Sequence, residues 1–145
     1  MSARRATSAA ERGRPTEAKG AGSTTTVRAV RAAKALYAKR AKDIVVLKVD
    51  EMTVITDYMV IATGRSVPQV KALCEHVEEE LAKDDVFARR REGMSEGRWC
   101  VLDYGDVMVH VFHEQDREYY QLERLWADGT NEIEVEYDAA DATEA

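Results

Sequence analysis

The chain has 145 residues, enough for one domain with its own hydrophobic core and too few to suggest two. Its 45% apolar content is typical of a folded globular protein, and no apolar run approaches the roughly 18 residues of a membrane-spanning helix. The net charge of −6 is uneven, with +3 in residues 1–23, −6 in residues 132–145 and −3 between them. An acidic body disfavours direct nucleic-acid contact and favours a basic protein partner.

Residues 1–23 are predicted to be a disordered N-terminal extension, because this polar, glycine-punctuated stretch has too little apolar surface to offset the entropy of ordering. The extension lacks the apolar middle region of a secretory signal. Its arginine, serine and alanine content is also typical of organellar transit peptides, but Glu11, Pro15 and Glu17 would interrupt an amphipathic helix. We therefore expect a bacterial cytoplasmic protein, with an organellar protein as the alternative.

Residues 24–130 are expected to form the α/β domain. An amphipathic helix is predicted from Thr24 or Thr25 to about Lys42, with Val27 and Val30 on its apolar side and basic residues facing solvent. This segment would supply the first helix of the core.

Two short apolar runs, Ile44–Val49 and Tyr58–Ala62, follow the helix and have the composition of strands covered on both faces. About eight residues separate them, too few for a crossover helix. The two strands are therefore predicted to be antiparallel neighbours.

A second helix is predicted to begin near Ser66. Ser66 and Gln69 have the spacing of a capping box, and Pro68 lies in the first turn, where its missing N–H costs little. The apolar residues of this helix recur at three and four positions: Val70, Leu73, Cys74, Val77 and Leu81.

Residues 86–91 are predicted to form a short edge strand, and a β-hairpin is predicted from Trp99–Asp103 and Val107–His113 around a turn at Tyr104 and Gly105. A single helix should follow, with Asp116 as its N-cap. Its expected core-facing stripe consists of Tyr119, Leu122, Leu125 and Trp126.

Residues 131–145 are predicted to form an acidic C-terminal tail with little order, although Ile133–Tyr137 alternates like an edge strand. The complete order, a helix, two strands, a helix, two or three strands and a helix, predicts an α/β domain with a mixed sheet packed by helices.

No residue pattern indicates catalysis or a metal site. The strand between His110 and His113 would point their side chains to opposite faces, and Cys74 and Cys100 lie within apolar runs, as buried reduced thiols do in a reducing compartment. No Ser-His-Asp arrangement and no glycine-rich phosphate loop occurs. We predict no catalytic residue, no metal and no cofactor.

The ordered motifs from Val30 to Asp128 resemble those of the ribosomal silencing factor family, also called Iojap-like proteins. The matching residues include Asp43-Ile44-Val45-Val46, Thr56-Asp57-Tyr58, Gly64, Gln69-Val70, Gly97, Trp99, Leu102-Asp103-Tyr104-Gly105-Asp106, Val109-His110-Val111-Phe112, Arg117, Tyr120, Leu122-Glu123-Arg124-Leu125-Trp126 and Asp128. The resemblance implies a nucleotidyltransferase-like α/β fold.

The resemblance also implies a non-enzymatic translation repressor. Family members bind the large ribosomal subunit through ribosomal protein uL14, prevent the small subunit from joining when nutrients are scarce, and are homodimers when free. A generic dimeric adaptor and a nucleotidyltransferase-fold enzyme are the alternatives. The second is weakened because Gly64 and Ser66 fit that fold, but Asp103 and Asp106 lack the two-residue spacing of its metal-binding acids.

Seven residues of the C-terminal half are candidates for partner binding. Aromatic residues and arginine dominate binding hot spots, so an exposed patch is expected to draw on Trp99, Tyr104, Tyr120 and Trp126, although some of these aromatic residues could instead fill the core. Asp106 and Arg117 would form its polar rim, and His110 would lie in the core or at the interface. The full set is Trp99, Tyr104, Asp106, His110, Arg117, Tyr120 and Trp126.

Overall fold

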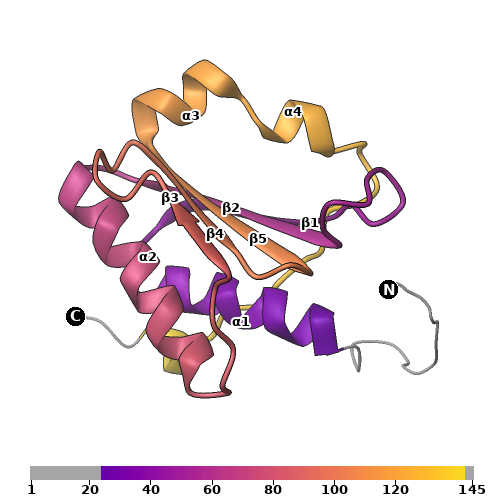
Figure 1. Ribbon diagram of the computed structural model, residues 1–145, viewed down its shortest axis with the longest axis horizontal. Coiled ribbons are helices and arrows are strands. Elements are labelled where there is room, and N and C mark those ends of the chain that lie inside the picture. Colours follow the sequence, from indigo (N-terminus) through magenta and orange to yellow (C-terminus); the bar gives the residue numbers. More distant parts are fainter. Residues whose placement is uncertain (1–23, 143–145) are drawn as a thin grey trace.

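The computed structural model describes residues 24–142 (Figure 1). Its elements are α1 (Thr24–Ala38), β1 (Lys42–Lys48), β2 (Tyr58–Gly64), α2 (Val67–Ala82), β3 (Arg90–Glu92), β4 (Trp99–Asp103), β5 (Val107–His113), α3 (Glu114–Tyr120), α4 (Glu123–Trp126) and the 3₁₀ helix η4 (Ala139–Asp141). The predicted N-terminal extension lies outside the described residues.

The five strands form one mixed sheet in the order β1-β2-β5-β4-β3. β2 pairs with β5 in parallel, and the other neighbouring pairs are antiparallel. The antiparallel β1–β2 pair, the β4–β5 hairpin and the α/β class are therefore confirmed. The parallel pair is possible because α2, β3 and β4 all lie between β2 and β5 in the chain, which gives the connection enough length to cross over.

Helices α1 and α2 cover one face of the sheet, and α3 and α4 lie over the other (Figure 1). In α1 the buried side is built from small residues such as Ala29, Ala32 and Ala33, which let the helix pack closely. The predicted apolar side is displaced from this one, because the Val27 side chain is 53% exposed. The helix also ends at Ala38, before the predicted end at Lys42.

Helix α2 begins as the sequence predicts. Ser66 is the N-cap, and its Oγ accepts the backbone N–H of Gln69 at 3.2 Å. The Gln69 side chain accepts the N–H of Arg65 at 2.6 Å, one residue before the N–H that a capping box would use. The predicted core stripe is confirmed, and its buried residues are Val70, Leu73, Cys74, Val77 and Leu81.

Strand β3 is shorter and later than predicted, since only Arg90–Glu92 pairs with β4. It is followed by Gly93, whose φ of +82° favours glycine. A Cβ atom there would lie 2.0 Å from the carbonyl oxygen of Trp99, so this tight approach excludes any other residue. The glycine thereby lets the chain turn back into β4.

The single helix predicted after the hairpin is divided in two. Helix α3 begins directly after β5, and its N-cap is His113, whose Nδ1 accepts the N–H of Gln115, so the prediction of Asp116 as cap is wrong. Gln121 adopts a left-handed conformation (φ 49°) and separates α3 from α4. As a result the predicted stripe is broken, with Tyr119 81% and Leu125 70% exposed.

The C-terminal segment packs on the domain as far as the structure describes it. Glu132 and Leu47 form an isolated antiparallel β-bridge through their backbones, and the N–H of Ile133 donates to the carbonyl of Val46 at 2.8 Å. Tyr137 stacks on Tyr37 of α1 with ring centroids 4.4 Å apart. The prediction of little order is therefore wrong for residues 131–142, because the alternating apolar side chains cover the edge of β1.

Cys74 and Cys100 are both buried and form no disulfide, as the sequence predicts. They share the core between α2 and the sheet, where a hydrogen bond with Cys100 and burial raise the pKa of the Cys74 thiol. None of the helices within residues 24–142 combines the length and apolar character needed to cross a membrane.

We predict that Tyr137→Ala lowers the free energy of unfolding by about 1–2 kcal/mol, because it removes the stacked ring on Tyr37 and part of the apolar cover of the sheet edge. Urea titration followed by circular dichroism measures the change. The control is Glu136→Ala at the neighbouring, exposed position, expected within about 0.5 kcal/mol of the parent. Equal stability of both variants would show that the segment does not pack on the domain.

Candidate aromatic docking face

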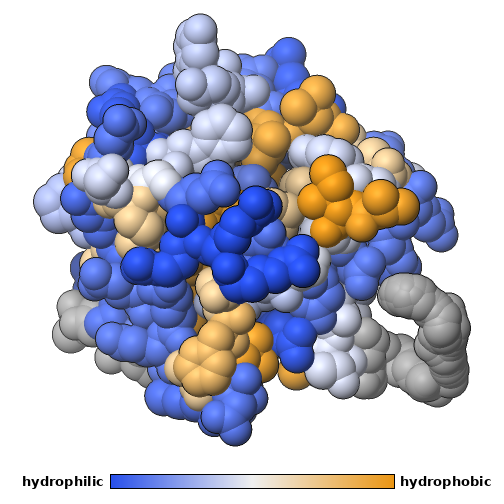
Figure 2. Space-filling view, viewed as in Figure 1, coloured by the Kyte–Doolittle hydropathy of each residue, from blue (hydrophilic) through white to orange (hydrophobic). Residues whose placement is uncertain are grey.

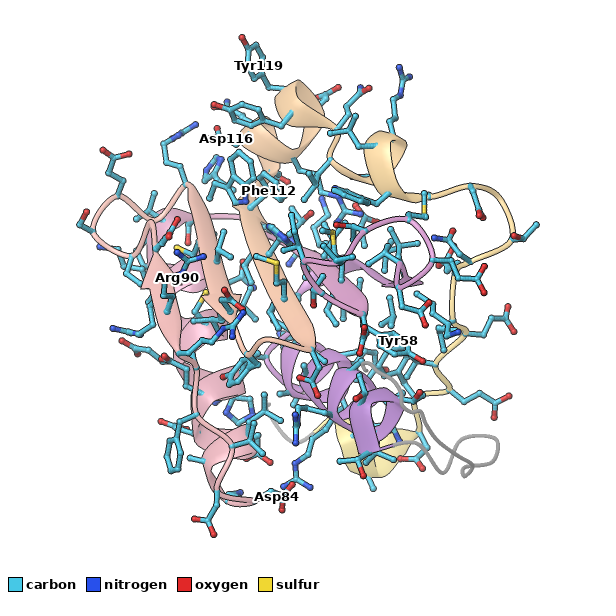
Figure 3. The ribbon with its side chains drawn as sticks, turned by 45° about the vertical axis from the view of Figure 1, so that its right-hand side comes forward. Tyr58, Asp84, Arg90, Phe112, Asp116 and Tyr119 are labelled. Atoms are coloured by element: carbon cyan, nitrogen blue, oxygen red, sulfur yellow. The ribbon has the colours of Figure 1, made fainter. Side chains whose placement is uncertain are left out.

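Strand alternation divides the side chains between the two faces of the sheet. Val109 and Val111 of β5 join the core beneath α1 and α2, whereas Phe112 joins the second core beneath α3 and α4. Figure 3 shows Phe112 on the side of the sheet that α3 covers, with Tyr119 farther out on that helix. The sheet therefore separates two apolar layers of different size.

The second layer is only partly covered by helix. Helices α3 and α4 have 7 and 4 residues, against 15 and 16 in α1 and α2. We call this side of the sheet, with α3 and α4, the aromatic face. Its large apolar and aromatic side chains that reach solvent include Val45, Trp99, Val101, Met108, Tyr119, Tyr120, Leu125 and Trp126.

Aromatic rings pack in sequence across one end of this face. Trp99 stacks on Phe112 with centroids 4.9 Å apart and meets Tyr120 at 4.8 Å. Tyr119 then meets Tyr120 edge to face at 4.9 Å. Phe112 is fully buried, but Tyr120 is 49% exposed, so the cluster is anchored in the core and ends at the surface. Two predicted residues, Trp99 and Tyr120, are thus brought together.

His110 lies next to this cluster in the sheet. Its Nδ1 accepts the indole N–H of Trp99 at 3.1 Å, so its Nε2 carries the proton. Nε2 is buried and has no hydrogen-bond partner within residues 24–142. Burial lowers the pKa of His110 to about 4, so the imidazole is neutral at pH 7. The ring fixes the orientation of Trp99.

Trp126 closes the other end of the aromatic face. It packs with Leu122 against a core that includes Leu47 and Ile61. Asn131 holds the end of α4 by donating to the carbonyls of Trp126 at 2.8 Å and Lys48 at 2.9 Å. Trp126 is thereby fixed between the sheet and solvent.

The sequence analysis missed an exposed apolar loop beside α4. In the connection between β1 and β2, Met52, Val54 and Ile55 are 43%, 102% and 61% exposed. The Met52 sulfur lies 3.6 Å from Nδ2 of Asn131, so the loop borders the end of α4. Figure 2 shows apolar surface gathered over α4 and this loop. Three apolar residues within a turn were the signal that could have identified it.

Tyr104 and Asp106 lie away from the aromatic face. Tyr104 is 9% exposed and belongs to the core beneath α2, where burial raises its pKa. Asp106 accepts from the guanidinium of Arg28 at 2.6 Å and from the hydroxyl of Thr25 at 3.1 Å. Both residues hold α1 and α2 on the sheet, so neither shares a surface with Trp99.

Arg117 also differs from its expected place on a polar rim. Its side chain is 10% exposed and forms a salt bridge with Glu123 at 3.1 Å. The guanidinium points inward between the sheet and the two short helices. Five of the seven predicted residues therefore belong to the aromatic face: Trp99, Tyr120 and Trp126 reach solvent, whereas His110 and Arg117 lie just beneath them.

The described residues offer little for catalysis. Ser66 is used as a helix cap, and arginine side chains already pair with Asp103 and Asp106. No group of three or more histidine, cysteine or acidic side chains in residues 24–142 could hold a metal ion. Burial, then repulsion from Asp50 and Asp106, raises the pKa of Asp57 to about 6, but its position is remote from Ser66 at the opposite end of β2.

The family model described as "Ribosomal silencing factor during starvation" matches residues 23–145. The chain belongs to the ribosomal silencing factor family. It is 40% identical over 97 residues to the ribosomal silencing factor of Bacillus subtilis, covering 67% of this chain and 82% of that one. It is 30% identical over 95 residues to a mouse protein named mitochondrial assembly of ribosomal large subunit protein 1. That match covers 63% of this chain and 41% of the mouse protein.

The crystal structure of a Chromobacterium violaceum protein matches with a TM-score of 0.70 at 34% identity, covering 83% of this chain and 98% of that one. The family resemblance and the mixed-sheet α/β fold are thus confirmed. Family membership supports a regulatory role at the ribosome, whereas the nucleotidyltransferase-like label stays a prediction. The family match also includes residues 131–142, in agreement with their packing on the domain.

We predict that acid destabilises the fold through His110. Its folded pKa of about 4 lies below the ordinary 6.5, so the stabilisation present above pH 6.5 is lost as the pH falls toward 4. Glutamine does not titrate, so between pH 6.5 and 4 the free energy of unfolding of His110→Gln should fall by up to about 3 kcal/mol less than that of the parent. Urea titrations of both proteins between pH 4 and 7 measure it, and parallel curves would show that His110 is not kept neutral by the fold.

Proposed function

We propose that this protein binds the large ribosomal subunit through ribosomal protein uL14 and prevents the small subunit from joining, so that translation is repressed when nutrients are limiting. The mechanism is steric exclusion, in which a small domain occupies the surface that the other subunit needs. The aromatic face is the proposed contact. The observation that carries this proposal is a face with apolar side chains exposed on helices packed against the sheet, in a chain of the ribosomal silencing factor family.

The aromatic face has the composition of a binding centre. Tyrosine and tryptophan contribute most of the binding energy at protein interfaces when they are desolvated. Tyr120, Leu125 and Trp126 reach solvent from two short helices held on the sheet, so little ordering is needed on binding. A stable interface of this kind buries on the order of 1,200–2,000 Å² in total.

Acidic side chains surround this centre. Residues 114–128 contain five carboxylates, at Glu114, Asp116, Glu118, Glu123 and Asp128, against the two arginines Arg117 and Arg124. Complementary charge raises the rate of encounter and disfavours partners of the same sign. The sign of this segment suits a basic ribosomal protein and disfavours direct contact with ribosomal RNA.

We further propose that the protein acts in the bacterial cytoplasm, with an organelle as the alternative if residues 1–23 are a transit peptide. The free protein is proposed to be a homodimer, because an exposed apolar surface favours self-association until the ribosomal partner replaces it. A generic dimeric adaptor without a ribosomal partner is the competing function. The mouse relative's name, which refers to the ribosomal large subunit, favours the ribosomal partner.

We predict that the protein co-migrates with free large subunits in a sucrose gradient of cell lysate and is absent from polysomes. With purified subunits, saturating amounts should prevent their association. A protein that stays at the top of the gradient would favour the adaptor, and unhindered subunit association would refute steric exclusion.

The contact is tested with residues that are already exposed, so that folding is little affected. Tyr120→Ala and Leu125→Ala should each weaken large-subunit binding at least about tenfold, as expected of interface anchors. The matched control is Phe87→Ala, which removes a 68% exposed aromatic side chain outside the aromatic face. If the three variants bind alike, the contact lies elsewhere.

The enzymatic alternative makes a different prediction. Because Ser66 is a helix cap, Ser66→Ala should cost about 1 kcal/mol of stability and leave large-subunit binding unchanged. A nucleotidyltransferase would instead show turnover of labelled nucleotide with Mg²⁺ that disappears in this variant. Turnover of that kind would replace the proposed function.

A further inference from the structure

Arg117 joins three parts of the chain through its guanidinium group. Nη1 donates to the backbone carbonyl of Asp43 in β1 and, at 2.9 Å, to Oγ1 of Thr63 in β2. Nε and Nη2 both donate to Oε2 of Glu123 in α4, at 3.2 and 3.1 Å. The side chain starts from α3, so one residue connects both short helices to two strands.

Helix α4 has few other fixed points. It consists of four residues. Among the described residues of the chain, its N-cap Leu122 makes no side-chain capping bond, and none of the four helical residues is buried. A helix this short is not stable by itself, so its position depends on tertiary contacts. Those contacts include the buried Leu122 side chain, the packing of Trp126 on the second core, the bonds from Asn131 at the end of the helix, and the salt bridge from Arg117 to Glu123.

The residues of the proposed contact lie on both sides of this salt bridge. Tyr120 ends α3, three residues after Arg117, and Trp126 ends α4, three residues after Glu123. Between the helices the chain passes through the left-handed residue Gln121. A change in the angle between α3 and α4 would therefore separate Tyr120 from Trp126.

We propose that Arg117 is a positioning residue: with Glu123 it holds α3 and α4 in the orientation that presents Tyr120, Leu125 and Trp126 to the ribosomal partner, without touching that partner. This inference rests on the proposed function. It replaces the expectation that Arg117 lies on the polar rim of the interface.

A direct contact is disfavoured by the bonding of the guanidinium. Four of its five N–H groups already donate within the chain, and the side chain is only 10% exposed. A basic partner would also be repelled by an arginine at the interface. Arg117 therefore acts through the helices that it holds.

Hydrogen exchange tests the positioning directly. In Arg117→Lys, the ammonium keeps the charge but cannot bond to β1, β2 and Glu123 together. Amides of residues 118–127 should exchange at least about tenfold faster than in the parent, while those of β2 and β5 are unchanged. Parent-like exchange in residues 118–127 would overturn the proposal. If Arg117→Lys also speeds the exchange of β2 and β5, the test is repeated with Glu123→Gln, which keeps the shape of the side chain. Residues 118–127 should again exchange at least about tenfold faster than in the parent.

Binding to purified large subunits separates positioning from contact. Arg117→Lys should weaken binding at least about tenfold in the parent, but less than about threefold in a Leu125→Ala background, because both changes act through α4. In a Phe87→Ala background, which changes an exposed residue outside the aromatic face, the full effect should remain. Equal losses in both backgrounds would indicate a direct contact or a general loss of folded protein and would overturn the proposal.

The two proposals fail in different ways. If the parent protein does not bind large subunits, the proposed function is wrong, and the exchange experiment still decides whether Arg117 holds α3 and α4. If the parent binds but the exchange of residues 118–127 does not respond to Arg117→Lys, only the positioning role is wrong.

Discussion

The structure depends on covering both faces of one five-stranded sheet with unequal helices. The parallel pairing of β2 with β5 places two strands at the centre whose side chains point alternately to both sides. Helices α1 and α2 are long enough to close one side, whereas α3 and α4 close only part of the other. The apolar surface that remains is therefore a consequence of the fold, and it is the surface to which we assign binding.

Local signals predicted much of the fold. The Ser66 cap, the β4–β5 hairpin and the antiparallel β1–β2 pair all rest on residues joined by short connections, so their signals are complete in the sequence. The break at Gln121 has no such signal, because Tyr119, Leu122 and Trp126 have helical spacing whether or not the helix is continuous. The packing of residues 131–142 depends on β1, which is far away in the chain. The acidic residues of this segment, which face outward, made it look like a solvated tail, although the apolar residues between them pack inward.

The candidate site was partly accessible from the sequence. Alternation alone puts Trp99 and Val101 on one side of β4 and the side chains of Leu102 and Tyr104 on the other, so the separation of Tyr104 from Trp99 follows from the strand. The role of Arg117 cannot be predicted in this way, because its acceptors Asp43 and Thr63 lie 74 and 54 positions earlier in the chain. Composition identified the aromatic residues, and only tertiary contacts reveal which of them are fixed and exposed.

A partly buried ion pair is a costly way to hold two short helices, because only the arginine side of it is well shielded from solvent. Desolvation offsets much of the attraction between Arg117 and Glu123, so apolar side chains of similar size would give similar stability. Apolar contacts, however, have no preferred direction and would let a four-residue helix shift across the sheet. The guanidinium can donate to its carbonyl, hydroxyl and carboxylate partners together in only one arrangement. For the function that we propose, directional bonding is needed because the exposed aromatic side chains must keep their spacing without a partner to order them.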